Sequence, residues 1–238
     1  MARLFSTGSP ASRLLRPLVN RLAPEGPAWV AVRSGPAQGV RLLIDTKKEK
    51  FLWTGLHEPA VQEAISRLLR PGMSFWDIGA HVGFFTVLGA RLVGDEGSVH
   101  AFEPVEENRR RLQSAVEKNG CRNITIHEVA LSATPGEAVL HTHESSAMWS
   151  LAGESAEGVT VRCETLDSLD LPPPDLIKID AEGVEVEVLR GGRKLLSDAE
   201  RALLVEFTTP ALVDEARELL PAYSFEHLAG NHWLLMSH

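Results

Sequence analysis

The pattern of apolar and polar residues changes its period near residue 74. Before that point, two apolar runs, Trp29 to Val32 and Val40 to Ile44, predict strands joined by a turn at residues 34–36. Helical spacing of apolar residues from Val61 to Leu69 predicts a helix that begins at Pro59, because proline fits the first helical position. From Phe75 onward, short apolar runs alternate with longer amphipathic segments, which predicts strand–helix units and a parallel sheet.

In the alternating region, turns that contain glycine or proline separate the predicted strands and helices. The expected core strands are residues 74–78, 98–102, 124–129, 176–179 and 202–205, followed by a hairpin of residues 224–228 and 233–236. The expected helices are residues 83–92, 105–119, 184–196 and one that begins at Pro210. Residues 138–141 and 159–163 are expected to form an antiparallel insertion, with residues 142–158 as a loop.

Composition limits the classes of protein to consider. The chain has 238 residues, 44% of them hydrophobic, which suits one α/β domain with an extension. Its formal charge of -8 argues against binding nucleic acid through phosphates. Cys121 and Cys163 form no metal-binding spacing, so we expect reduced thiols and a cytoplasmic protein. No apolar run is long enough for stable membrane insertion.

The first residues are basic and amphipathic. Apolar residues from Leu14 to Leu22 share one helix face, and four arginines precede the first acid, Glu25. This pattern favours a helix packed on its own domain over a transit peptide or a membrane-surface helix. We expect the helix to act as a lid over a site or as an element of a homodimer.

Acidic residues follow the predicted core strands. Four strand ends carry one each: Asp77, Glu103, Asp180 and Glu206. In open parallel sheets, ligands bind beyond the carboxyl ends of the strands. The sequence therefore predicts a binding site at this edge, although a single acid at a strand end is unremarkable.

The turn after the first core strand contains Gly79 and Gly83, and Asp77 precedes it. The spacing differs from the GxGxxG fingerprint of dinucleotide sites, and an acid before the turn would repel a diphosphate. A cationic ligand that carries a nucleoside, such as S-adenosylmethionine, fits better, with Glu103 binding the ribose diol. The alternative is that both glycines serve strand–helix packing alone.

Several segments resemble the FkbM-type family of class I S-adenosylmethionine-dependent methyltransferases. Asp77–Thr86 resembles motif I of that class, and Ala101–Pro104 resembles its ribose motif. Leu166–Leu169, Ile177–Glu185 and Val188–Gly191 resemble the FkbM hallmark. The segment Gly55–Pro59 resembles the entry segment that precedes motif I, so the similarity spans about residues 50–210.

The resemblance implies a Rossmann-like α/β fold with a seven-stranded sheet in the order 3-2-1-4-5-7-6 and an antiparallel last strand. Residues 51–238 would then form the methyltransferase domain, and residues 1–50 a small extension of helix and short strands. The cofactor-binding residues that it implies are Glu58, Asp77, Gly79, Ala80, His81, Gly83, Glu103, Pro104, Glu128, Val129, Ala130 and Asp180. His81 replaces an Asn common in the family and can titrate.

The implied reaction is methyl transfer to a hydroxyl oxygen of a natural product or sugar, which requires a group that accepts the hydroxyl proton. The candidate catalytic residues are Asp180, Glu182, His57 and Lys178. Each has a structural alternative: cofactor orientation for Asp180, a helix cap for Glu182, packing for His57 and a buried ion pair for Lys178. In the loop, Met148 and Trp149 are candidates for acceptor contacts and His143 for a base; the alternative is a loop whose Trp149 covers the edge of the sheet.

Asp180, Glu182 and Glu206 can also be arranged to bind Mg²⁺, but no ligand spacing demands a metal, so we predict none.

Other functions fit parts of the pattern. A nitrogen- or carboxyl-directed methyltransferase acting on a peptide or metabolite would use the same cofactor site. A Rossmann oxidoreductase conflicts with the acid before Gly79. A non-catalytic module that binds a nucleoside cofactor is the third alternative.

Overall fold

The structure is a computed structural model that describes residues 26–142, 149–150, 158–181, 183–197 and 200–237. The predicted N-terminal helix, Glu182, His143 and Met148 lie outside these residues. None of the helices in the described ranges has the length and apolar character needed to cross a bilayer.

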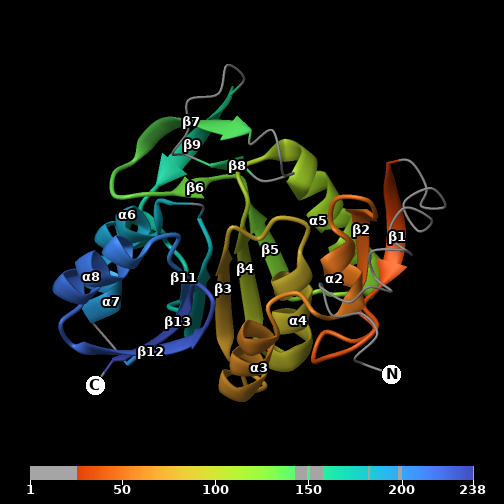
Figure 1. The fold of residues 1–238 in the computed structure, drawn as a ribbon, viewed down its shortest axis with the longest axis horizontal. Helices are drawn as coiled ribbons and strands as arrows, with labels where there is room; N and C mark the ends of the chain where they lie inside the picture. Colours follow the sequence, from red (N-terminus) through yellow and green to blue (C-terminus); the bar gives the residue numbers. More distant parts are fainter. Residues whose placement is uncertain (1–25, 143–148, 151–157, 182, 198–199, 238) are drawn as a thin grey trace, which may run out of the picture.

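A seven-stranded sheet forms the centre of the molecule (Figure 1). Its strands are β3 (Ser74–Ile78), β4 (Ser98–Phe102), β5 (Ile124–His127), β10 (Leu176–Ile179), β11 (Ala202–Glu206), β12 (Tyr223–Ala229) and β13 (His232–Ser237). They lie in the order β12-β13-β11-β10-β3-β4-β5, which is the predicted order 3-2-1-4-5-7-6 in core-strand numbering. β13 runs antiparallel to β11, as predicted, and its register sets His232 opposite Glu206.

Helices cover both faces of the sheet, because alternate residues of each strand point to opposite sides. One face carries α3 (Pro59–Leu68), α4 (Phe84–Val93) and α5 (Glu106–Asn119), packed on residues such as Phe75 and Val99. The other carries α6 (Glu185–Arg190), α7 (Arg193–Ser197) and α8 (Pro210–Leu219), packed on Trp76 and Ile177. Strands that are apolar on both sides are typical of such a buried sheet, and β3 and β10 are buried throughout.

The predicted helix over residues 184–196 is wrong as a single element, because α6 ends at Arg190 and α7 begins at Arg193. Gly191 and Gly192 lie between them, against the segment that contains η2 (Leu166–Ser168). A Cβ on Gly191 would lie 2.2 Å from the carbonyl oxygen of Ser132. The close backbone approach that glycine permits therefore interrupts the helix.

The predicted strand over residues 124–129 is two residues too long, since β5 ends at His127. The chain then leaves the main sheet, and β6 (Ala130–Leu131) pairs with β9 (Gly158–Glu164). β9 also pairs antiparallel with β7 (Gly136–Thr142), which confirms the predicted antiparallel insertion, and β7 pairs with β8 (Trp149–Ser150). This second sheet lies beyond the carboxyl edge of the main one in Figure 1.

The N-terminal strands β1 (Pro27–Ala31) and β2 (Arg41–Asp45) form the predicted antiparallel pair. Their buried residues, including Leu42 and Ile44, belong to the same hydrophobic cluster as β3 and α4. Arg111 of α5 donates to the carbonyl of Leu43 at 2.9 Å and forms a buried ion pair with Glu49. The short helix α2 (Lys50–Thr54), which the sequence pattern did not indicate, follows and leads into the site.

Candidate active site

The four acids predicted at strand ends all lie at the carboxyl edge of the sheet. Asp77 is in β3 and Glu206 ends β11, while Glu103 and Asp180 directly follow β4 and β10. Since β4, β3, β10 and β11 are neighbours in this order, the carboxyl groups form a row along one edge. The prediction that the parallel topology gathers these residues is therefore confirmed.

The glycine loop after β3 packs tightly between the ends of β4 and β10. The backbone N–H groups of Gly79 and Ala80 donate to the carbonyl of Phe102 at 3.0 and 3.1 Å. Gly79 has a φ of 78°, and a Cβ there would lie 1.9 Å from the carbonyl oxygen of Asp180. Gly83 also has a positive φ, 90°, and precedes α4. A Cβ on Gly83 would lie 2.5 Å from Leu112 Cδ1, so packing accounts for both glycines.

Glu103 is buried and its carboxylate is held in one orientation. Oε1 accepts from the N–H of Val105 at 2.9 Å and from Asn108 Nδ2 at 3.3 Å, while Oε2 accepts from the N–H of His81 at 2.8 Å. Burial raises the pKa of Glu103, and these donors partly offset the shift. A carboxylate oxygen accepts about two hydrogen bonds, so Oε2 keeps a lone pair for a further donor.

A buried ion group occupies the centre of the row. Lys178 Nζ lies 3.1 Å from Asp180 Oδ2 and 3.8 Å from Asp77 Oδ1, and 5.1 Å from the ring centroid of Phe85. Burial alone would lower the pKa of Lys178, but the two carboxylates outweigh it and raise that pKa. Asp77 is 1% exposed; its Oδ2 accepts from Thr86 Oγ1 at 2.6 Å, and Oδ1 has no hydrogen bond among the described residues.

The two carboxyls at Asp180 and Glu206 differ in protonation. Burial favours the neutral form of Asp180, but Lys178 outweighs it and holds the pKa of Asp180 below its usual value. Burial and the neighbouring Asp180 raise the pKa of Glu206 to about 8. Two close carboxyls that cannot both ionise freely show this divergence, so at neutral pH Asp180 is the ionised member.

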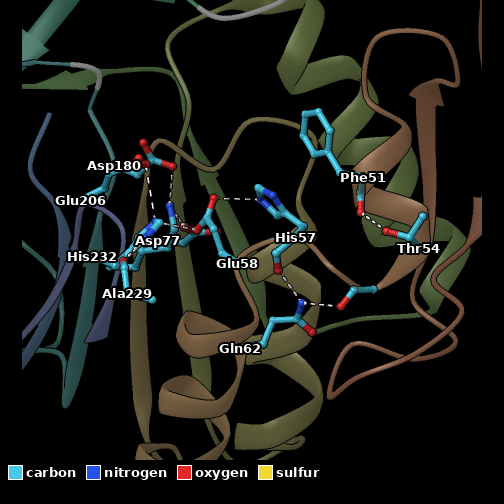
Figure 2. Close-up of polar contacts among 12 residues, drawn as sticks. Phe51, Thr54, His57, Glu58, Gln62, Asp77, Asp180, Glu206, Ala229 and His232 are labelled. Carbon is cyan, nitrogen blue, oxygen red and sulfur yellow. Dashed lines mark hydrogen bonds and ion pairs between the residues drawn. The ribbon is translucent and has the colours of Figure 1, made fainter. Parts of the chain in front are cut away.

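Glu58 enters the same group from the other side, between α2 and α3 (Figure 2). Its Oε1 lies 3.3 Å from His57 Nε2, and its Oε2 lies 3.1 Å from His232 Nε2. His232 Nε2 in turn lies 3.7 Å from Glu206 Oε2. Glu58 has a left-handed backbone with a φ of 42°, a strained conformation for this residue type. The side chain of Gln62 donates to the carbonyl of the preceding residue, His57, at 2.5 Å and so supports this turn.

His57 lies among aromatic rings, with its centroid 5.0 Å from that of Phe84, 5.4 Å from Phe85 and 5.8 Å from Phe51. Burial lowers its pKa, which leaves the imidazole neutral at physiological pH despite the adjacent Glu58. His81 is similar: burial lowers its pKa to about 4, so the titration expected for it occurs in acid.

The remaining predicted residues flank this group without joining it. Ala80 is buried in the glycine loop, and Pro104 follows Glu103 and accepts at its carbonyl from Arg109. Glu128 is 75% exposed and pairs with Arg109 at 3.2 Å. Val129 packs partly on the core, and Ala130 is buried in β6. Ala80 lies after β3 and the others after β4 and β5, all at the same edge of the sheet.

Sequence reasoning missed three residues of the site. His232 contacts Glu58 and Glu206, Thr86 donates to Asp77, and Glu49 lies 3.5 Å from His81 Nε2 through its Oε1. The register between β11 and β13 would have indicated His232, because it sets this residue opposite Glu206. No local pattern marks Glu49, which long-range packing brings to the glycine loop.

Sequence comparison identifies related proteins. Residues 77–227 match the methyltransferase FkbM domain. A curated relative, hexuronic acid methyltransferase AglP of Haloferax volcanii, is 24% identical over 182 residues, which cover 68% of this chain and 72% of AglP.

Similar solved structures agree with the fold. Methyltransferase FkbM of Methylobacillus flagellatus superimposes with a TM-score of 0.52 and 18% identity over 79% of this chain, but the chain spans 55% of that protein. A putative methyltransferase from Streptococcus mutans, solved in complex with SAH, has a TM-score of 0.50 and 11% identity over 76% of this chain and 99% of its own. Because the FkbM domain match covers most of the chain, including the glycine loop and the segment around Asp180, this protein belongs to the FkbM family of class I methyltransferases.

Proposed function

We propose that the protein transfers the methyl group of S-adenosylmethionine to a hydroxyl oxygen of a sugar or other small-molecule acceptor. The observation that carries this proposal is the excess of carboxyl groups at the edge of the sheet. Asp77 and Asp180 pair with Lys178, and Glu58 and Glu206 contact His232. An acidic edge beside a glycine loop suits a cationic nucleoside better than a diphosphate.

The residues present fit the cofactor. Glu103 keeps a lone pair on Oε2 for a ribose hydroxyl. Asp77 Oδ1 is buried, accepts no hydrogen bond within the described ranges and lies 3.8 Å from Lys178 Nζ, so it can accept one from an ammonium group. Glu128, Val129 and Ala130 follow β5 and are the candidates for contacts to adenine. The cofactor supplies an electrophilic methyl group on a sulfonium.

The chain's own contribution is to orient the acceptor and to remove its proton. His57, neutral at physiological pH, and the ionised Asp180 are the two described candidates for the base. Glu182 is a third, from the segment after β10. A general base contributes about 10²–10⁴-fold in rate. Lys178 keeps Asp180 ionised and fixed, which is a positioning role.

Two observations favour a sugar acceptor. The relative AglP is named as a hexuronic acid methyltransferase, although at 24% identity. In this chain, Phe51 is 50% exposed and stacks beside His57, so an aromatic face borders the candidate base. Apolar sugar faces pack well on such rings. Nitrogen- or carboxyl-directed transfer uses the same cofactor site and is the alternative.

The first experiment is calorimetric titration of the protein with S-adenosylmethionine, its demethylated product and NAD. We expect the first two to bind and NAD not to bind. A folded protein that binds neither methyl donor nor product would refute the proposal. A panel of sugars, uronic acids, peptides and amines, each incubated with labelled methyl donor, then identifies the acceptor. If only amines are labelled, the methyl group is transferred to nitrogen and not to oxygen.

A further inference from the structure

The cluster of Glu58, Glu206 and His232 has the composition and geometry of a metal site. Each residue offers one ligand atom, and the three atoms lie within 4.8 Å of one another. They come from three separate parts of the chain: the turn before α3, the end of β11 and the start of β13. Figure 2 shows the three side chains converging on one point beside Asp180.

The contacts of His232 with Glu58 and Glu206 require a positive charge among the three side chains. Its Nδ1 lies 3.2 Å from the carbonyl oxygen of Ala229, an arrangement in which Nδ1 carries the ring proton. Nε2 then presents a lone pair to Glu58 Oε2, 3.1 Å away. Both atoms are buried, and neither has a hydrogen bond among the described residues. The pair needs a positive charge between the two atoms, which either a second proton on His232 or a bound cation supplies.

The spacing fits coordination. Oxygen and nitrogen ligands bind zinc-sized ions at about 2.0–2.2 Å, so neighbouring ligands lie roughly 3.0–3.5 Å apart in octahedral or tetrahedral geometry. The distances from His232 Nε2 to Glu58 Oε2 and Glu206 Oε2, 3.1 and 3.7 Å, are close to this range. The Nδ1 contact to a backbone carbonyl is the arrangement that usually orients a metal-binding histidine.

We propose that Glu58, Glu206 and His232 bind a divalent first-row transition-metal ion at the acceptor end of the carboxyl edge. One imidazole with two carboxylates suits Mn²⁺, Fe²⁺ or Zn²⁺ better than Mg²⁺, which prefers oxygen ligands alone. This set shares only Glu206 with the Mg²⁺ ligands considered from the sequence. His232 and Glu206 line the same small hollow as Asp180, so an ion there borders a candidate base. A role for the ion in polarising an acceptor oxygen rests on the proposed function, whereas the binding of the ion does not.

The test is titration of metal-stripped full-length protein with Mn²⁺, followed by electron paramagnetic resonance and calorimetry. We expect one tightly bound Mn²⁺ per chain, with affinity reduced at least tenfold in His232→Ala and in Glu58→Gln. His227→Ala is the matched control, because His227 lies on the same hairpin, is exposed and faces away from the cluster's three ligands in the register. Its affinity should equal that of the wild type.

Two results would overturn the proposal: no Mn²⁺ or Zn²⁺ binding by folded wild-type protein, or binding that His232→Ala leaves unchanged. In the first case, histidine NMR should show a protonated His232 that bridges the two carboxylates. Binding of S-adenosylmethionine to the stripped protein is measured in parallel. Retained cofactor binding without metal binding would refute the metal site alone, and the converse would refute the cofactor site alone.

Discussion

At the scale of single residues, charge and burial decide what each site residue does. Asp180 and Glu206 are both acids at strand ends, yet the pKa of one is lowered and that of the other is raised to about 8. The difference comes from Lys178, which contacts Asp180 at 3.1 Å. Residue type alone therefore does not assign a protonation state, because burial and the neighbouring charges set it.

Glu103→Gln should weaken binding of S-adenosylmethionine about tenfold to a hundredfold, because a hydrogen bond to a charged group contributes about 1.5–3 kcal/mol. Calorimetry measures the change. Glu106→Gln is the control, since Glu106 lies on the exposed side of α5 and pairs with Arg110. Equal affinities for the two variants would show that Glu103 does not bind the ribose.

Lys178→Met should lower the free energy of unfolding by about 3–5 kcal/mol, because removing one partner of a buried ion group leaves uncompensated charge. Lys178 is 3% exposed between Asp77 and Asp180. Urea denaturation measures the loss, with the exposed Lys194→Met as control. A variant as stable as the control would mean that the carboxyls take up protons instead of remaining charged.

At the scale of elements, the ends of β3, β4 and β10 depend on a turn without side chains. Gly79 approaches the backbone of Asp180, and its N–H bonds to Phe102 of β4. The sequence predicted this strand–turn–helix unit and its glycine turn. It did not predict the break at Gly191–Gly192, because the contact that requires it involves Ser132, distant in the chain.

Gly79→Ala should cost more than the conformational penalty of a positive φ, because the new Cβ would overlap the carbonyl of Asp180. Gly120→Ala provides the reference: its φ is 69°, and no atom lies within 4 Å of the Cβ position. The free energy of unfolding should fall by about 1–2 kcal/mol in the control. In Gly79→Ala it should fall by about 1–3 kcal/mol more, because of overpacking. Thermal and urea unfolding compare them; equal losses would show that the loop moves to accommodate the methyl group.

At the scale of the whole molecule, burial of histidines couples stability to pH. Burial lowers the folded-state pKa of His81 to about 4, below the unfolded value of 6.5. Between these values the unfolded chain binds the proton and the folded chain does not. The contribution of His81 is therefore fully present above pH 6.5 and is lost as pH falls toward 4. The raised pKa of Glu206 acts in the opposite direction, so the total profile alone does not isolate His81.

His81→Asn isolates this contribution, because Asn tolerates the left-handed backbone at this position, where φ is 50°, and does not titrate. The stability of the wild type relative to the variant should decrease from pH 7 to pH 4.5. Urea denaturation at several pH values measures both proteins. A difference that stays constant over this range would show that His81 is not buried in the neutral form.

The sequence by itself determined the fold class, the strand order through its family resemblance, and the row of acids at the carboxyl edge. These follow from local periodicity and from the rule that parallel strands end at one edge. Only the tertiary structure decided which side chains meet there. Glu58, Glu206 and His232 are far apart in the chain, and their contacts depend on strand register and on the turn before α3. Long-range packing sets these distances, and with them the protonation of each group.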